Sequence, residues 1–350
     1  MTVIVDFVRL KISVPIENIK KSEWKEPKEN WDSPWYFANK AKVKLKYSAY
    51  SQTLYVEGRI ISLNTKSYYL NFDDFEDPDS VIEEVYKKAN DFINSKLIDY
   101  KVNIADMKVT QIEYSFNIKY NIVTKYIEFL NYLYTQNKFV KYKRYSDYTE
   151  KEGNDLNGSF YLKSNGDYKD NSLKKFCLNI YDKSNQLANK RLKNIEEHHK
   201  SYIKHKDIKE SLNVLRIEYK AGYEHIKSIC KKYNIQPTLR NLLNEDIAKK
   251  ETENQLKRFF GAGDFYSKRT AEKIIADNNL KINLDIPISE LSEYKYKKFR
   301  KELEKLGICP YGFIPEEWGI SKMDNPIKLI LNKDKVLQPS GTERKNYDQQ

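Results

Sequence analysis

The segment QIEYSFNI, residues 111–118, decides the class of fold that this sequence predicts. Four apolar side chains alternate along it with three polar ones: Ile112, Tyr114, Phe116 and Ile118, against Glu113, Ser115 and Asn117. A period of two is typical of a β-strand with one apolar and one polar face. The segment therefore predicts a sheet strand that carries a carboxylate on its polar face.

Two further segments show the same alternation. Residues 175–183, KFCLNIYDK, place Asn179 and Tyr181 on the polar side, and residues 214–220, VLRIEYK, form the second such strand. If the three strands are neighbours, their polar faces form one surface. On that surface we expect two carboxylates, one phenol and three cations: Glu113, Glu218, Tyr181, Lys183, Arg216 and Lys220.

Around these strands the hydrophobic pattern predicts an α+β fold, with helices packed on one face of an antiparallel sheet. Further strands are expected at 3–14, 41–48, 53–63 and 159–163, and helices at 79–100, 123–135 and 184–206. From residue 224 onward only helices are expected, at 224–232, 246–260, 267–278 and 289–306. We therefore expect a first domain over 1–222, an all-α C-terminal domain over 223–332 and a flexible polar tail over 333–350.

The composition favours a polyanionic partner. Lys and Arg number 62 against 50 Asp and Glu, so the formal net charge is +12 and the pI about 9.1. Nucleic acid is the first candidate, and a Lys-, Asn- and Tyr-rich composition drawn from an AT-rich genome is the alternative. Membrane association is not expected, because no apolar run approaches the length of a spanning helix and the N-terminus does not resemble a signal peptide.

The cysteines and histidines argue against two other kinds of site. The three cysteines, Cys177, Cys230 and Cys309, are isolated, which excludes a zinc ribbon and a disulfide framework and fits a reducing cytoplasm. His198 and His199 are adjacent on an expected helix, whereas a two-histidine metal motif needs alternate positions on a strand. We expect both to be solvated.

Two segments combine the features of a nucleic-acid surface. Residues 131–150, NYLYTQNKFVKYKRYSDYTE, interleave tyrosines with Lys141, Lys143 and Arg144, as a surface for bases and phosphates would. The charged helix at 184–206 contributes Lys190 and Arg191. An exposed β-ribbon and a solvated charged helix remain the structural alternatives.

The polar strand face carries the groups needed to cut a phosphodiester. Carboxylates such as Glu113 and Glu218 hold hard divalent cations, Mg²⁺ or Mn²⁺, and the cation neutralises the scissile phosphate. A tyrosine phenol has an ordinary pKa of about 10, so a nearby cation is needed to stabilise the phenolate. The planar guanidinium of Arg216 is suited to donating two parallel hydrogen bonds to the oxygens of a phosphate. Alternation alone also produces polar outer faces, so an ordinary solvated face remains the alternative.

Four blocks of sequence together resemble the gene II/X replication protein family of filamentous phages and related plasmids. They are VDFVRLKI from Val5, QIEYSFNI from Gln111, LNIYDKSNQLANK from Leu178 and VLRIEYKAGYEHIKSI from Val214. Their order and spacing agree with the family across about residues 3 to 310. The resemblance implies a Rep-nuclease-like fold whose first domain, 1–222, nicks origin DNA to initiate rolling-circle replication.

The resemblance also implies roles for particular residues. Tyr181 matches the nicking tyrosine, which would form a 5′-phosphotyrosine and free a 3′-OH for a host polymerase, and Lys183 matches the lysine that steadies it. Glu113 and Glu218 match the family's metal-binding positions, although many relatives have Asp where this chain has Glu113. No third ligand is identified, and Asp182 is expected to be structural. The alternatives are a non-catalytic DNA-binding replication regulator and an RNA-binding protein.

Overall fold

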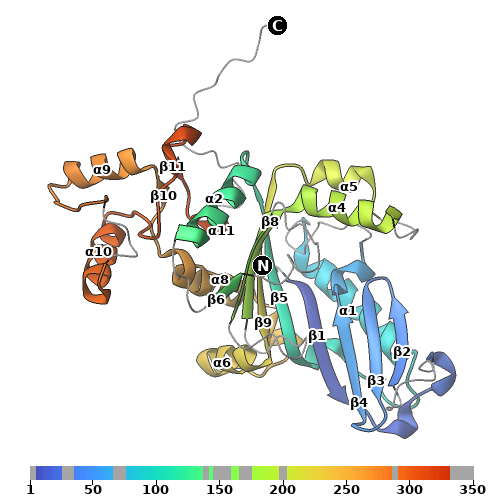
Figure 1. Cartoon of the computed structure of the whole chain (residues 1–350). Helices are drawn as coiled ribbons and strands as arrows, with labels where there is room; N and C mark the ends of the chain where they lie inside the picture. The colour runs from blue at the N-terminus through green and yellow to red at the C-terminus, as the bar shows by residue number, and fades with distance from the viewer. Residues whose placement is uncertain are drawn as a thin grey trace, which may run out of the picture. The chain divides into compact units, whose positions relative to one another are not determined.

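The structure, a computed structural model, confirms the α+β class. It describes residues 5–25, 35–65, 76–136, 142–144, 159–164, 176–196, 203–285 and 291–331. Within those ranges the strands form a nine-stranded sheet in the order β2-β3-β4-β1-β5-β9-β8-β7-β6 and a separate pair, β10-β11 (Figure 1). The pairs β1–β4, β1–β5, β2–β3 and β3–β4 are all antiparallel.

Seven of the nine strands of the large sheet lie where the alternating patterns predicted them. They are β1 (Val5–Ser13), β2 (Trp35–Lys40), β3 (Val43–Ser48), β4 (Thr53–Gly58), β5 (Lys108–Lys119), β6 (Tyr142–Arg144), β7 (Ser159–Ser164), β8 (Phe176–Asp182) and β9 (Val214–Gly222). The pattern at 53–63 is split, because β4 ends at Gly58 and a short 3-10 helix, Ile60–Leu63, follows. Strand β2 was not predicted, and β6 falls in the segment 131–150, for which an exposed β-ribbon was only the alternative.

The helices are also close to their predicted positions, except that α7 and α11 were not predicted. They are α1 (Pro78–Asn94), α2 (Val123–Gln136), α4 (Lys183–Glu196), α5 (His205–Glu210), α6 (Tyr223–Tyr233), α7 (Leu239–Leu242), α8 (Glu245–Phe260), α9 (Lys268–Asp277), α10 (Glu293–Lys305) and α11 (Pro326–Leu331). The expected helix at 184–206 corresponds to α4 and the first residues of α5. In the region expected to be all helical, the strands β10 (Phe265–Tyr266) and β11 (Lys322–Met323) are additional.

The chain divides into two compact units. The first comprises Met1–Ser115, Lys163–Leu178 and Glu218–Glu251, and the second comprises Phe116–Leu162, Asn179–Ile217 and Thr252–Gln350. Strands β5, β7, β8 and β9 and helix α8 therefore each contribute residues to both units. The domain boundary at residue 222 remains a prediction, and the tail at 333–350 lies outside the described residues.

The core of the first unit lies on one face of strands β1 to β5. Leu10 of β1 opposes Val56 of β4, which opposes Leu45 of β3, and all three are fully buried. Helix α1 runs behind these strands (Figure 1) and contributes apolar side chains at helical spacing, among them Val85 and Ala89. Their alternate neighbours along the strands point to the opposite, polar face.

Gly58 ends β4 in a conformation that only glycine adopts easily. Its φ is +135°, and a Cβ there would lie 2.0 Å from the carbonyl oxygen of Lys42. The next residue, Arg59, donates its backbone N–H to that same oxygen. The close approach therefore fixes where the chain leaves the sheet and turns into the 3-10 helix.

We predict that Gly58→Ala lowers the free energy of unfolding by about 3 kcal/mol or more, because the clash involves backbone and cannot relax cheaply. Gly307→Ala is the matched control, since Gly307 also has a positive φ, +70°, but nothing lies within 4 Å of an added Cβ. The control should lose only about 1 to 2 kcal/mol. Denaturant unfolding measures both, and equal losses would contradict the clash.

A buried carboxylate joins two helices of the first unit. Glu251 of α8 is 4 % exposed and accepts hydrogen bonds from Lys232 Nζ at 2.7 Å and Tyr233 OH at 2.9 Å. His225 Nε2 lies 3.8 Å from its other oxygen. Burial acts to raise the pKa of Glu251, but the side chains of His225, Lys232 and Tyr233 outweigh it and hold the pKa at about 2.

We predict that Glu251→Gln destabilises the protein by about 1 to 3 kcal/mol at neutral pH. A carboxyl whose pKa is lower in the folded chain stabilises it above the unfolded pKa, here 4.5, and loses that contribution as the pH falls towards about 2. The difference between wild type and variant should therefore shrink between pH 5 and pH 3, as measured by chemical unfolding at each pH. A difference that stays constant over this interval would contradict the pKa assignment.

The second unit has its own apolar core around β10. The ring centroids of Phe129 and Phe265 are 5.0 Å apart, and those of Phe260 and Phe265 are 6.1 Å apart. A fully buried amide, Asn325, donates to the carbonyl oxygen of Gly263 at 2.7 Å. Helices α9 and α10 pack through a smaller cluster that includes Ala271 and Leu303. Within the described ranges, no helix combines the length and apolar character needed to cross a bilayer.

Candidate active site

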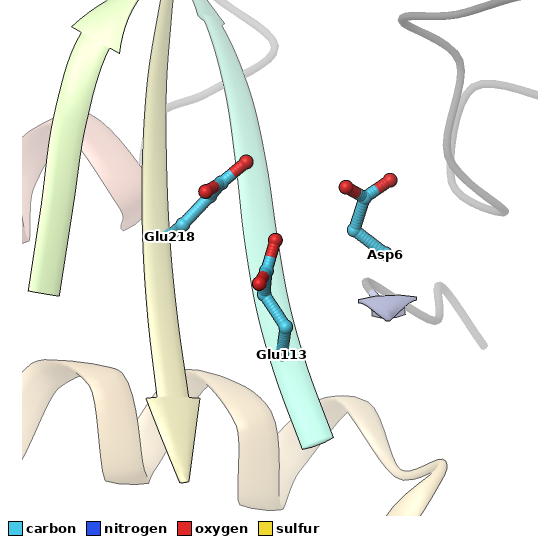
Figure 2. A group of neighbouring side chains, drawn as sticks. All are labelled: Asp6, Glu113 and Glu218. Carbon is cyan, nitrogen blue, oxygen red and sulfur yellow. The ribbon is translucent and has the colours of Figure 1, made fainter. Parts of the chain in front are cut away.

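Three carboxylates converge in the first unit and form an acidic triad. Asp6 of β1, Glu113 of β5 and Glu218 of β9 each place an oxygen within 4.8 Å of the others (Figure 2). Glu113 is 4 % exposed and Glu218 is 5 % exposed, while Asp6 is half-buried. Glu113 and Glu218, which the alternation predicted to share a surface, are thus brought together, and Asp6 joins them.

A β-bulge aims Asp6 at the other two carboxylates. Val5 opposes Tyr114 and Phe7 opposes Glu113, so two steps along β1 match one step along β5 and Asp6 is the extra residue. Strict alternation would have placed Asp6 on the side of Val8, in the core. The bulge instead turns its side chain to the polar face, a common device beside functional sites.

Two cations already contact the triad. Arg59 donates from Nε to Asp6 Oδ1 at 2.7 Å and is 7 % exposed. The ammonium of Lys220 lies 2.6 Å from Glu113 Oε2. Burial lowers the pKa of Lys220, against the opposite effect of the Asp6 carboxylate. The predicted DNA contact Lys220 is therefore placed beside a triad carboxylate.

The three carboxylates of the triad repel one another. Three carboxylates within 4.8 Å repel one another by roughly 3 kcal/mol per pair at an effective dielectric of about 20. Arg59 and Lys220 offset part of this repulsion. The all-oxygen donor set fits a hard divalent cation such as Mg²⁺ or Mn²⁺. A bound cation would compete with Lys220 for an oxygen of Glu113.

Tyr181 and Lys183 form a contact in the second unit. Lys183 Nζ donates to the phenol oxygen of Tyr181 at 3.4 Å and lies 5.5 Å from the centre of its ring. The same ammonium donates to Gln186 Oε1 at 3.0 Å. Both Tyr181 and Lys183 are buried, at 3 % and 4 % exposed. Such a pair can stabilise a phenolate, because the ammonium supplies a charge-assisted hydrogen bond.

Asp182, between them, has a structural role, as expected. Its Oδ1 accepts from the hydroxyl of Ser184 at 2.7 Å and from the backbone N–H of Asn185 at 3.1 Å. Asp182 thereby satisfies a free N–H at the start of α4. This cap holds the end of β8 and the start of α4 together, which fixes Tyr181 and Lys183 on adjoining elements.

The remaining predicted DNA contacts occupy varied environments. Arg216 is fully buried and donates from Nη1 to Asn117 Oδ1 at 3.1 Å. On α4, Lys190 is exposed and Arg191 is half-buried. Lys143 and Arg144 lie on β6, and Lys141 lies outside the described residues. Whether any of them contacts DNA stays a prediction.

Asp6 and Arg59 were not predicted as site residues from the sequence. Asp6 interrupts the apolar start of a strand, and a charged residue in that position is the signal that could have identified it. Arg59 directly follows Gly58, where the strand pattern had been extended too far. Both errors come from assuming a regular strand where the structure has a bulge or a strand end.

No family model matches the sequence, and no curated protein matches it. Among solved structures, the chain is similar to the rolling circle replication initiator protein from Geobacillus stearothermophilus. The identity is 9%, the match covers 73% of this chain and 84% of that chain, and the TM-score is 0.31. The chemistry of the site itself therefore has to carry the functional conclusion.

We predict that Mn²⁺ stabilises the protein and that Asp6→Asn, Glu113→Gln and Glu218→Gln each remove most of that effect. A ligand at 100 times its Kd adds about 2.7 kcal/mol of stability, so the loss is measurable as a change in the Mn²⁺-dependent shift of Tm. Glu57→Gln is the control, because Glu57 is a nearby strand carboxylate already paired with Arg9 and Lys46. An equal loss in the control would place the metal elsewhere.

Proposed function

We propose that the protein initiates rolling-circle replication by cutting one strand of origin DNA with a metal-dependent tyrosine transesterification. The convergence of Asp6, Glu113 and Glu218 carries this proposal, because three carboxylates around one point are what a phosphoryl-transfer metal requires. The four blocks that resemble the gene II/X family support the same reaction. We further propose a cytoplasmic location and contact with host replication proteins.

In this proposal Asp6, Glu113 and Glu218 would hold Mg²⁺ or Mn²⁺, and the bound cation would neutralise the scissile phosphate and polarise it for attack. The charges of the site favour this assignment. Three clustered carboxylates attract a divalent cation, and the bound cation would in turn attract the phosphodiester of DNA.

Tyr181 supplies the nucleophile and Lys183 steadies it. The phenol loses its proton to solvent, its oxygen forms a bond to phosphorus, and the bond from phosphorus to the 3′ oxygen breaks. The 3′ oxygen takes up a proton, which leaves a free 3′-OH and a 5′-phosphotyrosine. Lys183 already donates to the phenol oxygen, so its ammonium is positioned to stabilise the phenolate. Rejoining the strand is the reverse reaction.

One observation favours a second function, a replication regulator that binds DNA without cutting it. Tyr181 is only 3 % exposed, and a buried tyrosine beside a lysine also serves as ordinary packing. Under this alternative the triad would be a structural network with Arg59 and Lys220. The reaction, in contrast, requires that the phenol oxygen reach the phosphate.

We predict that the wild type, given Mn²⁺ and a supercoiled plasmid with the cognate origin, produces a nicked circle with protein attached to its 5′ end. Tyr181→Phe removes only the attacking oxygen, so it should abolish the adduct and lower nicking by at least about 100-fold. Denaturing gels measure the adduct, and filter binding measures affinity for the origin, which should be unchanged.

Tyr50→Phe is the matched control, because Tyr50 lies in the β3–β4 turn and is 92 % exposed. It should nick like the wild type. Nicking that survives Tyr181→Phe would place the nucleophile elsewhere. Tight origin binding without nicking by either wild type or variant would favour the regulator.

A further inference from the structure

The polar face of the first unit carries a row of side chains that runs across five strands. Phe37 of β2 opposes Lys46 of β3, which opposes Tyr55 of β4, and Tyr55 opposes Lys11 of β1. Lys11 in turn opposes Lys108 of β5. Directly opposed side chains lie about 5 Å apart. The row therefore places two aromatic rings among three basic groups over about 20 Å of sheet.

A second row lies beside the first on the same face. Lys44 opposes Glu57, and Glu57 opposes Arg9. We call the two rows together the platform: Arg9, Lys11, Phe37, Lys44, Lys46, Tyr55, Glu57 and Lys108. Lys108 is exposed and the other seven are half-buried. The side chains on the other face of the same strands, such as Leu10 and Val56, are fully buried.

The platform has a surplus of positive charge. Its single carboxylate, Glu57, is paired with Arg9 at 3.1 Å and with Lys46 at 2.8 Å. Lys11 and Lys108 form no ion pair with any residue that the structure describes. The pKa of the Tyr223 phenol is lowered mainly by the side chain of Lys227, and the charges of Lys108 and Lys11 lower it further. Five cations against one carboxylate are suited to a chain of phosphates.

The aromatic rings argue for a single strand rather than a duplex. Phe37 and Tyr55 are separated by one strand, β3, which puts them about 10 Å apart. Lys44 Nζ lies 5.1 Å from the centre of the Phe37 ring, beside that ring on the same face. Aromatic side chains on a sheet stack on bases that are unpaired, whereas a duplex hides its base faces.

We propose that the platform binds single-stranded DNA and leads it to the acidic triad. Along β1, Phe7, Arg9 and Lys11 share one face, and Phe7 opposes Glu113. The two rows of the platform therefore continue directly into the triad within the first unit. The inference deepens the proposed function, since it states which form of DNA the metal centre receives and over which surface.

The test is the binding of fluorescent oligonucleotides of about 20 nucleotides, followed by anisotropy in metal-free buffer over a salt series. The probes are oligo-dT, a duplex of equal length and the matching RNA. Tyr55→Thr keeps a strand-forming residue but removes the ring, so it should weaken oligo-dT binding about 5- to 100-fold. Lys11→Gln with Lys108→Gln should also weaken it and should lower the salt slope by about 1.4.

The controls are Lys87→Gln with Lys101→Gln, which removes two exposed charges outside the platform, and Tyr50→Thr, which removes an exposed ring at a turn. Circular dichroism confirms that each variant is folded. Equal losses in the controls, no loss in the platform variants, or equal losses for the duplex would overturn the proposal, and tighter binding of RNA would overturn the assignment to DNA. A protein that binds oligo-dT through the platform but never nicks would leave this inference standing and remove the proposed reaction.

Discussion

Electrostatic repulsion among three carboxylates is the constraint on which the first unit depends. Asp6, Glu113 and Glu218 come from three strands of one sheet, and the side chains of Glu113 and Glu218 are buried. Their negative charges are tolerated only because cations lie nearby. Arg59 and Lys220 supply part of that compensation. The fold thus keeps three clustered carboxylates together at a cost in stability, and a metal ion bound between them would reduce their repulsion and add stability.

The arrangement of the sheet explains how such a site is kept rigid. β1 pairs with β4 on one side and β5 on the other, so the strand that carries Asp6 is held along both edges. The apolar side chains on the other face of β1, β3 and β4 form a closely packed core, in which Leu10, Leu45 and Val56 are fully buried. Strands place side chains more accurately than loops do. The polar face is therefore free to serve chemistry while the opposite face supplies the stability.

Much of this could be predicted from the sequence, because alternation is a local property that a regular strand preserves. Strands β5 and β9 were predicted with Glu113 and Glu218 on their polar sides, and the structure brings these two carboxylates together. Asp6 and Arg59 could not be found in this way, since a bulge and a strand end depend on partner strands that lie far along the chain. Burial was also misjudged: Arg216 and Tyr181 were expected on an open face, and both are enclosed. The roles of Tyr181 and Lys183 remain predictions.

The bulge at Asp6 has a consequence for how related chains can be recognised. Val5 and Val8 both face the core, so the spacing across the bulge is three residues where a regular strand has two. Loss of a single residue between them would restore the regular phase and leave one outward position where the bulge now provides two, for Asp6 and Phe7. Evolution can thus exchange the apolar residues around this position freely but can hardly change their number. An alignment that opens a one-residue gap here will pair the ligand with a core position, and the most diverged relatives will then seem to lack it.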